Sequence, residues 1–214
     1  MVHLQIELKF EPASGLHVTG ERARLWADKG LVVDWHEGKK PILPATTLKG
    51  WLRESAERIL RGIFPNICDS SQAGEICGSC LICEIFGAPR KRSPLYFSDA
   101  VLEDSAIDVR MNVSLSRHRK TAYEERLFST EVAWPKRVQT KIKGWFDSRD
   151  KALQVAAIIV LAAKAGYAIG ASRSRGLGWL RLIEWTLKLD GQKVAQEMLF
   201  QPIQRLRAQS EVVS

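Results

Sequence analysis

Apolar and polar residues alternate strictly near the start of the chain, where Leu4 to Phe10 carries an apolar side chain at every second position. This alternation predicts a strand with one buried face. From Leu48 to Ile63 the apolar positions recur with helical spacing, which predicts an amphipathic helix. Thr46 or Thr47 precedes this pattern and can cap the start of the helix.

Further strand-like runs lie at 95–101, 111–115 and 137–142. Residues 147–164 predict a second helix, which is almost wholly apolar at its centre and is therefore expected to be buried. A last strand follows at 179–189. The order strand, helix, strand, strand, helix, strand is that of the ferredoxin-like or split βαβ arrangement, which RNA-recognition modules share. The predicted fold class is therefore α+β.

Two long irregular regions interrupt this order, at residues 66–89 and 108–146. We interpret both as insertions into a single domain that spans residues 1–214, with a short amphipathic tail at 190–214. Neither an internal repeat nor a low-complexity segment accompanies them.

The chain is basic, with 32 Lys and Arg against 24 Asp and Glu and a formal net charge of +8. Such a charge favours a polyanionic partner, although it can also serve solubility alone. Met1 leads directly into the first strand pattern, so we expect no signal peptide. The longest apolar run, 155–163, is too short to span a bilayer. We expect a soluble, cytoplasmic protein without a membrane partner.

All four cysteines fall within sixteen positions, at Cys68, Cys77, Cys80 and Cys83. Four thiolates at this spacing are typical of a closed, tetrahedral structural zinc site. An iron–sulfur cluster is the alternative, because ferredoxins also contain C-x2-C-x2-C. The ferredoxin run, however, continues to a fourth cysteine followed by proline, and here the residues after Cys83 are Glu-Ile-Phe. We therefore favour structural Zn²⁺ in the 66–89 insertion.

A loop rich in glycine and arginine, 170–178 (GASRSRGLG), separates the second helix from the last strand. Glycine permits close backbone approach to an anion, and Arg173 and Arg175 offer planar forks that suit phosphate oxygens. No Gly-Lys-Ser/Thr ends the loop, so it is not a Walker loop. The alternative is a plain connector with solvated arginines.

Four motifs, taken in order, resemble the RAMP superfamily, specifically the backbone subunits of type III CRISPR effector complexes. They are the glycine turn at 15–20 (GLHVTG), the helix start at 42–53 (ILPATTLKGWLR), the pair at 85–87 (IFG) and 95–100 (LYFSDA), and the final loop at 174–178 (SRGLG). Ala45 replaces the usual glycine of the second motif, and the final loop carries an extra Ser-Arg.

The resemblance implies a palm domain with a sheet like that of RNA-recognition motifs and a protruding thumb β-hairpin, which we place at 108–146. It also implies that the subunit stacks along a CRISPR RNA guide, with other RAMP subunits and a large subunit as partners. The thumb would interrupt the pairing of the guide with single-stranded target RNA.

RNA contacts are expected from the glycine turn, the first helix, the thumb and the final loop. For His17 a structural role is nearly as well supported, and Lys49 and Arg53, one helical turn apart, could be ordinary surface charges without the resemblance. The expected contacts would position RNA backbone without reading sequence. The complete set is His17, Lys49, Arg53, Arg117, Arg119, Lys120, Ser172, Arg173 and Arg175.

Family members that cut target RNA carry an aspartate between the glycine turn and the first helix, and the resemblance places Asp28 at that position. Asp34 and Glu37 are alternative carboxylates in the same loop. The carboxylate could bind Mg²⁺ or another divalent ion, or align the RNA 2′-hydroxyl for attack on the adjacent phosphate. Asp28 would then make the chain an endoribonuclease that leaves a cyclic phosphate and a 5′-hydroxyl.

Three other functions stay open. The first is a structural RNA-binding subunit of the same complex without an active site. The second is a stand-alone endoribonuclease that matures CRISPR RNA, for which His17, His36 and His118 are the candidate acid–base groups. The third and weakest is a DNA-binding zinc protein, because no recognition-helix pattern accompanies the cysteines.

Overall fold

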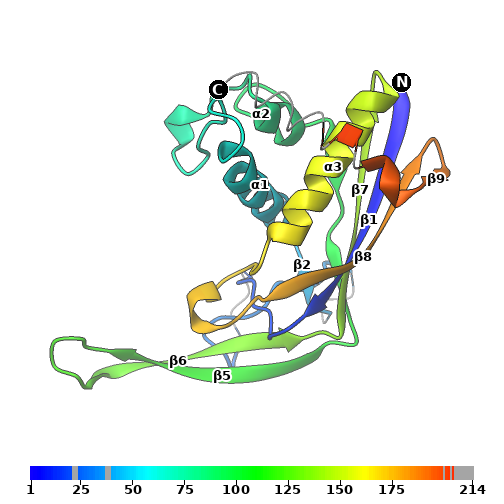
Figure 1. The fold of residues 1–214 in the computed structure, drawn as a ribbon. Helices are drawn as coiled ribbons and strands as arrows, with labels where there is room; N and C mark the ends of the chain where they lie inside the picture. The colour runs from blue at the N-terminus through cyan, green and yellow to red at the C-terminus, as the bar shows by residue number, and fades with distance from the viewer. Residues whose placement is uncertain (21–23, 37–39, 200, 203, 205–214) are drawn as a thin grey trace.

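The computed structural model describes residues 1–20, 24–36, 40–199, 201–202 and 204. These residues form a mixed α+β fold with two antiparallel sheets (Figure 1). The elements are β1 (Val2–Pro12), β2 (Ile42–Leu43), α1 (Ala45–Arg61), η1 (Ala73–Glu75), α2 (Leu81–Phe86), β3 (Leu95–Phe97), β4 (Ala100–Glu103), β5 (Ala106–Leu115), β6 (Ala122–Trp134), β7 (Arg137–Phe146), α3 (Arg149–Ala165), η2 (Arg173–Arg175), β8 (Leu180–Leu189), β9 (Gln192–Val194) and η3 (Gln196–Leu199).

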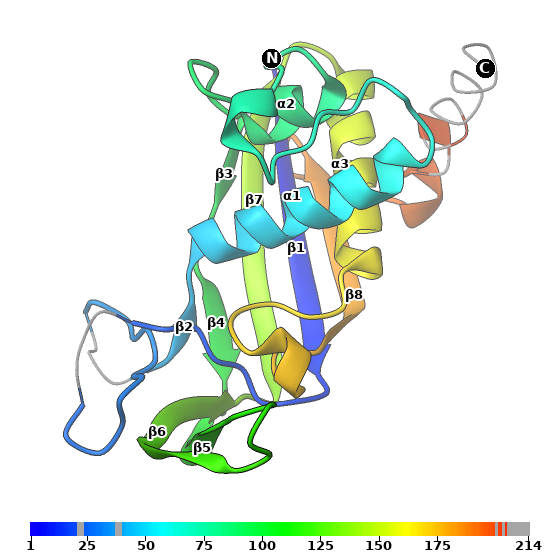
Figure 2. The same ribbon diagram turned by 90° about the vertical axis from the view of Figure 1, so that its left-hand side faces the viewer.

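The larger sheet has the order β2-β4-β7-β1-β8-β9, and β3 also pairs with β7. β1 lies at its centre and pairs antiparallel with both β7 and β8. The side chains of Leu4, Ile6, Leu8 and Phe10 are fully buried, so the strand predicted from their alternation is confirmed. α1 and α3 both lie on the face of the sheet that these residues share (Figure 2).

The two helices pack closely because a glycine follows α3. A Cβ atom at Gly166 would lie 2.1 Å from the indole ring of Trp51 on α1, which is far inside van der Waals contact. Trp51 in turn meets the ring of Phe10 edge-on, with 5.7 Å between the centroids. α3 is buried along most of its length, as its apolar sequence predicted. None of the described helices combines the length and the hydrophobicity that a membrane crossing requires.

The start of α1 differs from the prediction. The helix begins at Ala45 behind Pro44, and neither Thr46 nor Thr47 caps it. Instead the backbone N–H of Ala45 donates to the carboxylate of Asp99, at 2.7 Å. Asp99 lies where the predicted strand 95–101 breaks into β3 and β4. A distant carboxylate thus satisfies a free amide at the helix end, which local sequence cannot show.

The segment 108–146, which the sequence suggested as one insertion, divides in the structure. β5 and β6 form a separate two-stranded sheet that projects from the rest of the fold (Figure 1). β7 instead belongs to the larger sheet, where Ile142 pairs with Ile6 of β1. Its alternate residues are buried, and the exposed lysines between them made the stretch look like part of a basic insertion.

At the other end of the chain, β9 continues the sheet within the predicted tail, and residues 205–214 lie outside the described part.

Candidate nucleic-acid interface and metal centre

The four cysteines form one cluster, in which all sulfur atoms lie within 4.8 Å of one another. The Sγ of Cys68 is 3.4 Å from that of Cys83 and 3.6 Å from that of Cys80. A tetrahedral site with Zn–S bonds of about 2.3 Å has S–S edges of about 3.8 Å. The sulfurs therefore already have the spacing of a closed four-coordinate metal site.

Backbone amides shape one corner of this cluster. Gly78 has a φ of +74°, and the turn that it permits lets the N–H of Cys80 donate to the Sγ of Cys77, at 3.3 Å. Hydrogen bonds from the amides of Ser79 and Cys80 lower the pKa of the Cys77 thiol to about 6. Burial, with the neighbouring Cys68, raises the pKa of Cys83 to about 12. A bound cation is what would allow both sulfurs to be thiolates together.

Arg53 joins this cluster to α1. Its Nε donates to Glu57 at 2.8 Å, its Nη1 to the carbonyl oxygen of Gly87 at 2.8 Å, and its Nη2 points at the Sγ of Cys83 at 3.7 Å. The side chain is only 14% exposed. The structure therefore gives Arg53 an internal role, because its donor groups already face protein acceptors, and its predicted RNA contact stays a prediction.

Glu57 extends the same network into the insertion. It is buried, and its second oxygen accepts from the Ser70 hydroxyl at 2.8 Å and lies 3.5 Å from Arg61. Arg61 also pairs with Asp69 at 2.8 Å, next to Cys68. These contacts hold the cysteine-bearing segment 66–89, which has little core of its own, against α1.

An open groove of about 710 Å³ separates α1 from the loop after α2. Its cationic lining comprises Lys49, Arg53, Lys91 and Arg92. Burial, helped by the charge of Arg53, lowers the pKa of Lys49, whose ammonium faces the ring of Phe97 at 5.9 Å. Because burial disfavours the charged form of Lys49, an anionic ligand such as phosphate would stabilise that form.

The loop between α3 and β8 contacts both α1 and the hairpin. Arg173 pairs with Glu54 of α1 at 3.0 Å, and Arg175 lies 6.0 Å from the ring centroid of Phe128 on β6. Ser172 has a left-handed backbone with a φ of +60°. At Gly178 a Cβ atom would lie 2.0 Å from the carbonyl oxygen of Ile169, so this glycine serves close backbone packing. The arginines stand at the surface of the loop.

His17 is not at the surface. It is 1% exposed, and its Nδ1 donates to the carbonyl oxygen of Glu131 at 2.6 Å, which leaves Nε2 to accept from the Thr19 hydroxyl at 2.9 Å. Burial lowers its pKa, so the ring is neutral. This burial and both hydrogen bonds favour the structural alternative for His17, and its predicted base or phosphate contact stays a prediction.

Asp28 is exposed, and hydrogen bonds anchor it to β6. Its Oδ2 accepts from the N–H of Ser129 at 2.6 Å and from the Ser129 hydroxyl at 2.8 Å. These bonds lower the pKa of Asp28, so its carboxylate is ionised throughout the neutral range. Among the described residues Oδ1 accepts no hydrogen bond. Asp28 can thus bind a cation or accept a hydrogen bond, but it is a poor proton acceptor at neutral pH.

Asp34 and Glu37 are the other two carboxylates of the loop. The Oδ1 of Asp34 accepts from the backbone N–H of His36 at 2.7 Å, which is a local turn contact. Glu37 lies outside the described residues.

The basic run of the hairpin lies at its tip. Arg117, Arg119 and Lys120 are exposed in the turn between β5 and β6, far from the larger sheet (Figure 1). Sequence reasoning missed a second cationic position nearer the base, where Lys29 lies 5.0 Å from the ring of Phe128. Lys29 and Arg175 therefore share one aromatic neighbour, although 146 positions separate them in the chain.

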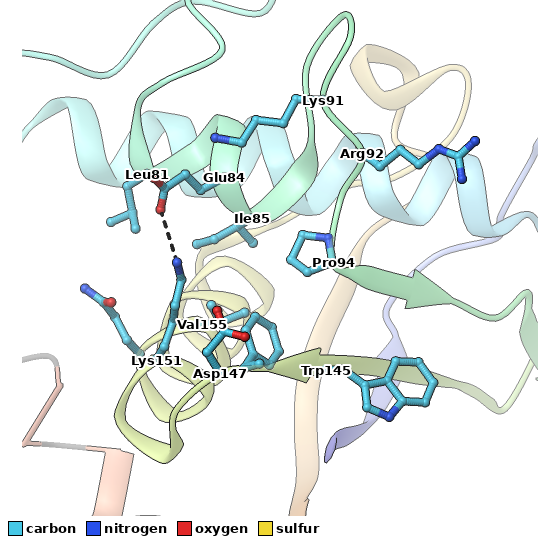
Figure 3. Close-up of a pocket in the computed structure, with 12 residues that line it drawn as sticks. Leu81, Glu84, Ile85, Lys91, Arg92, Pro94, Trp145, Asp147, Lys151 and Val155 are labelled. Carbon is cyan, nitrogen blue, oxygen red and sulfur yellow. Dashed lines mark ion pairs between the residues drawn. The ribbon is translucent and has the colours of Figure 1, made fainter. Parts of the chain in front are cut away.

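A further pocket of about 250 Å³ lies at the opposite end of the molecule, between α2, the end of β7 and α3 (Figure 3). Glu84 and Lys151 form an ion pair of 3.9 Å across it. Apolar side chains such as Ile85, Trp145 and Val155 make up much of the wall. The pocket shares Lys91 and Arg92 with the groove beside α1 but lies away from the hairpin and the loop of Asp28.

Comparison with known proteins places the chain in a family. The family model described as "RAMP superfamily" matches residues 31–181, which is more than half of the chain. The chain belongs to the RAMP superfamily. No curated protein sequence matches this RAMP protein.

The fold is also similar to that of a chain in a structure titled "Cryo-EM structure of the Type III-B Cmr-beta bound to cognate target RNA", with a TM-score of 0.60 and 16% sequence identity. The similarity covers 86% of this RAMP chain and 60% of the other, so the chain spans less than two thirds of that protein's length.

Replacing Arg53 should destabilise this RAMP protein, whereas replacing Lys49 should not. In Arg53→Ala the buried carboxylate of Glu57 loses the closer of its two arginine partners, and we expect the free energy of unfolding to fall by about 3 kcal/mol. Lys49→Ala removes no ion pair that the described residues show, so the free energy of unfolding should change by no more than about 0.5 kcal/mol. Urea unfolding followed by circular dichroism measures both, and equal effects of the two substitutions would contradict the assignment.

Proposed function

We propose that this chain is a guide-binding backbone subunit of a type III CRISPR effector complex, which acts in the cytoplasm. The observation that carries the proposal is the groove beside α1, because a RAMP fold there presents Lys49 and Arg92 on an open surface. Membership in the RAMP superfamily and the similarity to a chain of a type III-B complex bound to target RNA support it.

In this proposal the larger sheet with α1 and α3 is the ferredoxin-like palm, and the hairpin of β5 and β6 is the thumb. The order of the long elements β1, α1, β7, α3 and β8 supports the palm. The projection of the hairpin away from the sheet supports the thumb (Figure 1). Neighbouring RAMP subunits and a large subunit would be the protein partners.

The RNA contacts of the proposal are made by cations that the fold leaves at the surface. Lys49 would hold a guide phosphate in the groove, and Arg173 and Arg175 would hold backbone phosphates from their loop, aided by the amides around Ser172. Arg117, Arg119 and Lys120 would reach RNA at the tip of the thumb. Such contacts follow backbone shape and leave sequence recognition to base pairing between guide and target.

We assign the cysteine cluster to structural zinc. The short sulfur–sulfur distances, the amide donor to Cys77 and the absence of a fifth ligand among the described residues nearby suit a closed tetrahedral site. Zinc would supply the charge that makes four thiolates compatible in so small a space, and it would hold the insertion against α1.

We further propose that Asp28 takes part in cutting guide-paired target RNA. In that reaction the 2′-oxygen forms a bond to the adjacent phosphorus and loses its proton, while the P–O5′ bond breaks and O5′ gains a proton. Because Asp28 is ionised and one of its oxygens accepts no hydrogen bond from the described residues, it suits orienting the 2′-hydroxyl or holding a divalent cation such as Mg²⁺. Its chemistry would therefore be electrostatic and positional.

A second candidate is a structural subunit that does not cut RNA. The observation that favours it is the anchoring of Asp28 by Ser129, because a carboxylate that holds a loop in place needs no catalytic explanation. A stand-alone guide-maturing nuclease has less support, since His17 is buried and neutral.

Guide binding should depend on Lys49 through its charge. Lys49→Ala should weaken binding of a guide RNA about tenfold at moderate salt and lower the slope of log affinity against log salt concentration by about 0.7. Fluorescence anisotropy over a salt series measures both values. Lys193→Ala, an exposed lysine on β9 at the far edge of the sheet, is the matched control. Identical salt slopes for the unsubstituted protein, Lys49→Ala and Lys193→Ala would contradict a phosphate contact at Lys49.

The purified protein should contain about one zinc per chain, because four thiolates fill one tetrahedral site. Cys83→Ser should lose the metal and lower the melting temperature, whereas Ser79→Ala, within the same turn, should retain both. Elemental analysis by mass spectrometry with thermal unfolding measures these outcomes. Iron with acid-labile sulfide, or a metal-free protein of unchanged stability, would contradict the zinc assignment.

Asp28→Asn should slow target cleavage by the assembled complex by at least about 100-fold and leave guide binding unchanged. Asparagine keeps an oxygen that can accept from Ser129, so the loop stays anchored while the negative charge is lost. Ser129→Ala is the complementary variant, because it weakens the anchor and keeps the carboxylate. Gel analysis of labelled target RNA gives the rates.

A smaller loss in Ser129→Ala than in Asp28→Asn is expected. Undiminished cutting by Asp28→Asn would sink the catalytic assignment, and Asp34→Asn then tests the other described carboxylate of the loop.

A further inference from the structure

The loop that carries Asp28 also holds an exposed tryptophan in a fixed orientation. Trp26 is 60% exposed, yet its indole N–H donates to the Oε1 of Glu131 at 2.7 Å. Glu131 itself is 3% exposed. A polar edge that is bound to a buried carboxylate leaves the ring little freedom to turn, while most of its surface stays open to a ligand.

Glu131 is held as firmly as the tryptophan that it binds. Its Oε2 accepts from the backbone N–H of Leu31 at 2.9 Å and lies 3.7 Å from the Nε of Arg24. A buried carboxylate is costly unless such donors surround it. The contacts therefore fix Trp26 to β6 through Glu131, whose carboxylate is held in turn by Leu31 and Arg24 of the same loop.

The indole and the carboxylate of Asp28 lie on the same face of β6. Trp26 contacts Glu131 and Asp28 contacts Ser129, and residues two apart on a strand project to the same side about 7 Å from each other. The loop runs beside β6 in this region (Figure 2), where the backbone of Lys29 forms an isolated parallel β-bridge with that of Thr130. Phe128 and Arg175 project to the opposite face.

The charge around the ring points to an anionic ligand with a flat apolar part. The guanidinium of Arg24 lies 5.9 Å from the ring centroid. A nucleotide suits this pair of side chains, because its base can stack on the ring while its phosphate meets the arginine.

We propose that Trp26 is a stacking platform for one unpaired nucleobase of the target RNA, beside the bond at which Asp28 acts, with Arg24 near the adjacent phosphate. The proposal rests on the proposed function, since it names the ligand of the same loop. A nucleotide taken out of the base-paired helix is free to rotate its 2′-hydroxyl toward the phosphate. The platform would hold it in that state.

The apolar side chains of β5 continue this surface. Val109 and Met111 pair across from Glu131 and Ser129, and both are exposed. They extend the floor on which a base or a sugar could lie. They also identify the competing occupant, a neighbouring protein subunit, which the experiment must separate from RNA.

The experiment uses the assembled complex with two substitutions of one residue. Trp26→Leu removes the aromatic face and should slow target cleavage about 5- to 150-fold, the range expected for one stacked base. Trp26→Phe keeps a face and should retain most of the rate. Trp35→Leu is the matched control, because Trp35 lies on the same loop, is 83% exposed and makes no hydrogen bond through its side chain within the described residues.

A target with an abasic nucleotide beside the cut site completes the test. With the unsubstituted complex the abasic target should be slowed by the same factor as Trp26→Leu, and the two changes together should cost no more than either alone. Target affinity, measured in the Asp28→Asn background, should show the same pattern.

Three results would overturn the platform. Trp26→Leu could cut at the normal rate, the abasic penalty could be the same with and without Trp26, or Trp26→Leu could change the subunit composition in native mass spectrometry while the abasic penalty stays, which indicates a protein contact. A chain that binds no guide RNA overturns the proposed function and the platform together. Normal guide binding and cutting with an inert Trp26 overturns the platform alone.

Discussion

The pairing of β1 with both β7 and β8 brings three of the candidate functional segments together. Because both pairs are antiparallel, the end of β1 and the beginnings of β7 and β8 meet at one edge of the sheet, where Phe10 pairs with Val138 and Pro12 with Leu180. The loop of Asp28 leaves β1 there, the hairpin enters β7 there, and the arginine loop enters β8 there. Three segments far apart in sequence are thus neighbours by topology alone.

Local sequence patterns predicted the helices and strands well where the burial of one face determines the structure. The alternation in β1 and the apolar run of α3 each follow from burial on this sheet, and the spacing of the cysteines indicated their cluster. The strand at 137–142 was also predicted, but it was assigned to the basic insertion, because lysines occupy the exposed positions of β7 while its other positions are buried. Its place depends on β1, which is more than a hundred residues away.

Side-chain roles were harder to predict, because partners decide them and partners come from tertiary structure. Lys49 and Arg53 lie one turn apart on α1 and look equivalent in the sequence. Arg53 meets Glu57, Gly87 and Cys83, while Lys49 borders an open groove. His17 likewise finds the carbonyl oxygen of Glu131, 114 positions later. The loop of Asp28 depends on the same stretch of β6, so Glu131 and Ser129 organise a candidate site that no motif contains.

The contact between Asp99 and the first amide of α1 also limits how this protein can hold an anion. A helix start often binds phosphate through its free N–H groups and its partial positive charge. Here a carboxylate of the protein already occupies that position, at 2.7 Å from the N–H of Ala45. If RNA binds as proposed, a strand that crosses α1 therefore meets a neutralised helix end, and the ammonium of Lys49, one turn farther on, sets its register along the helix.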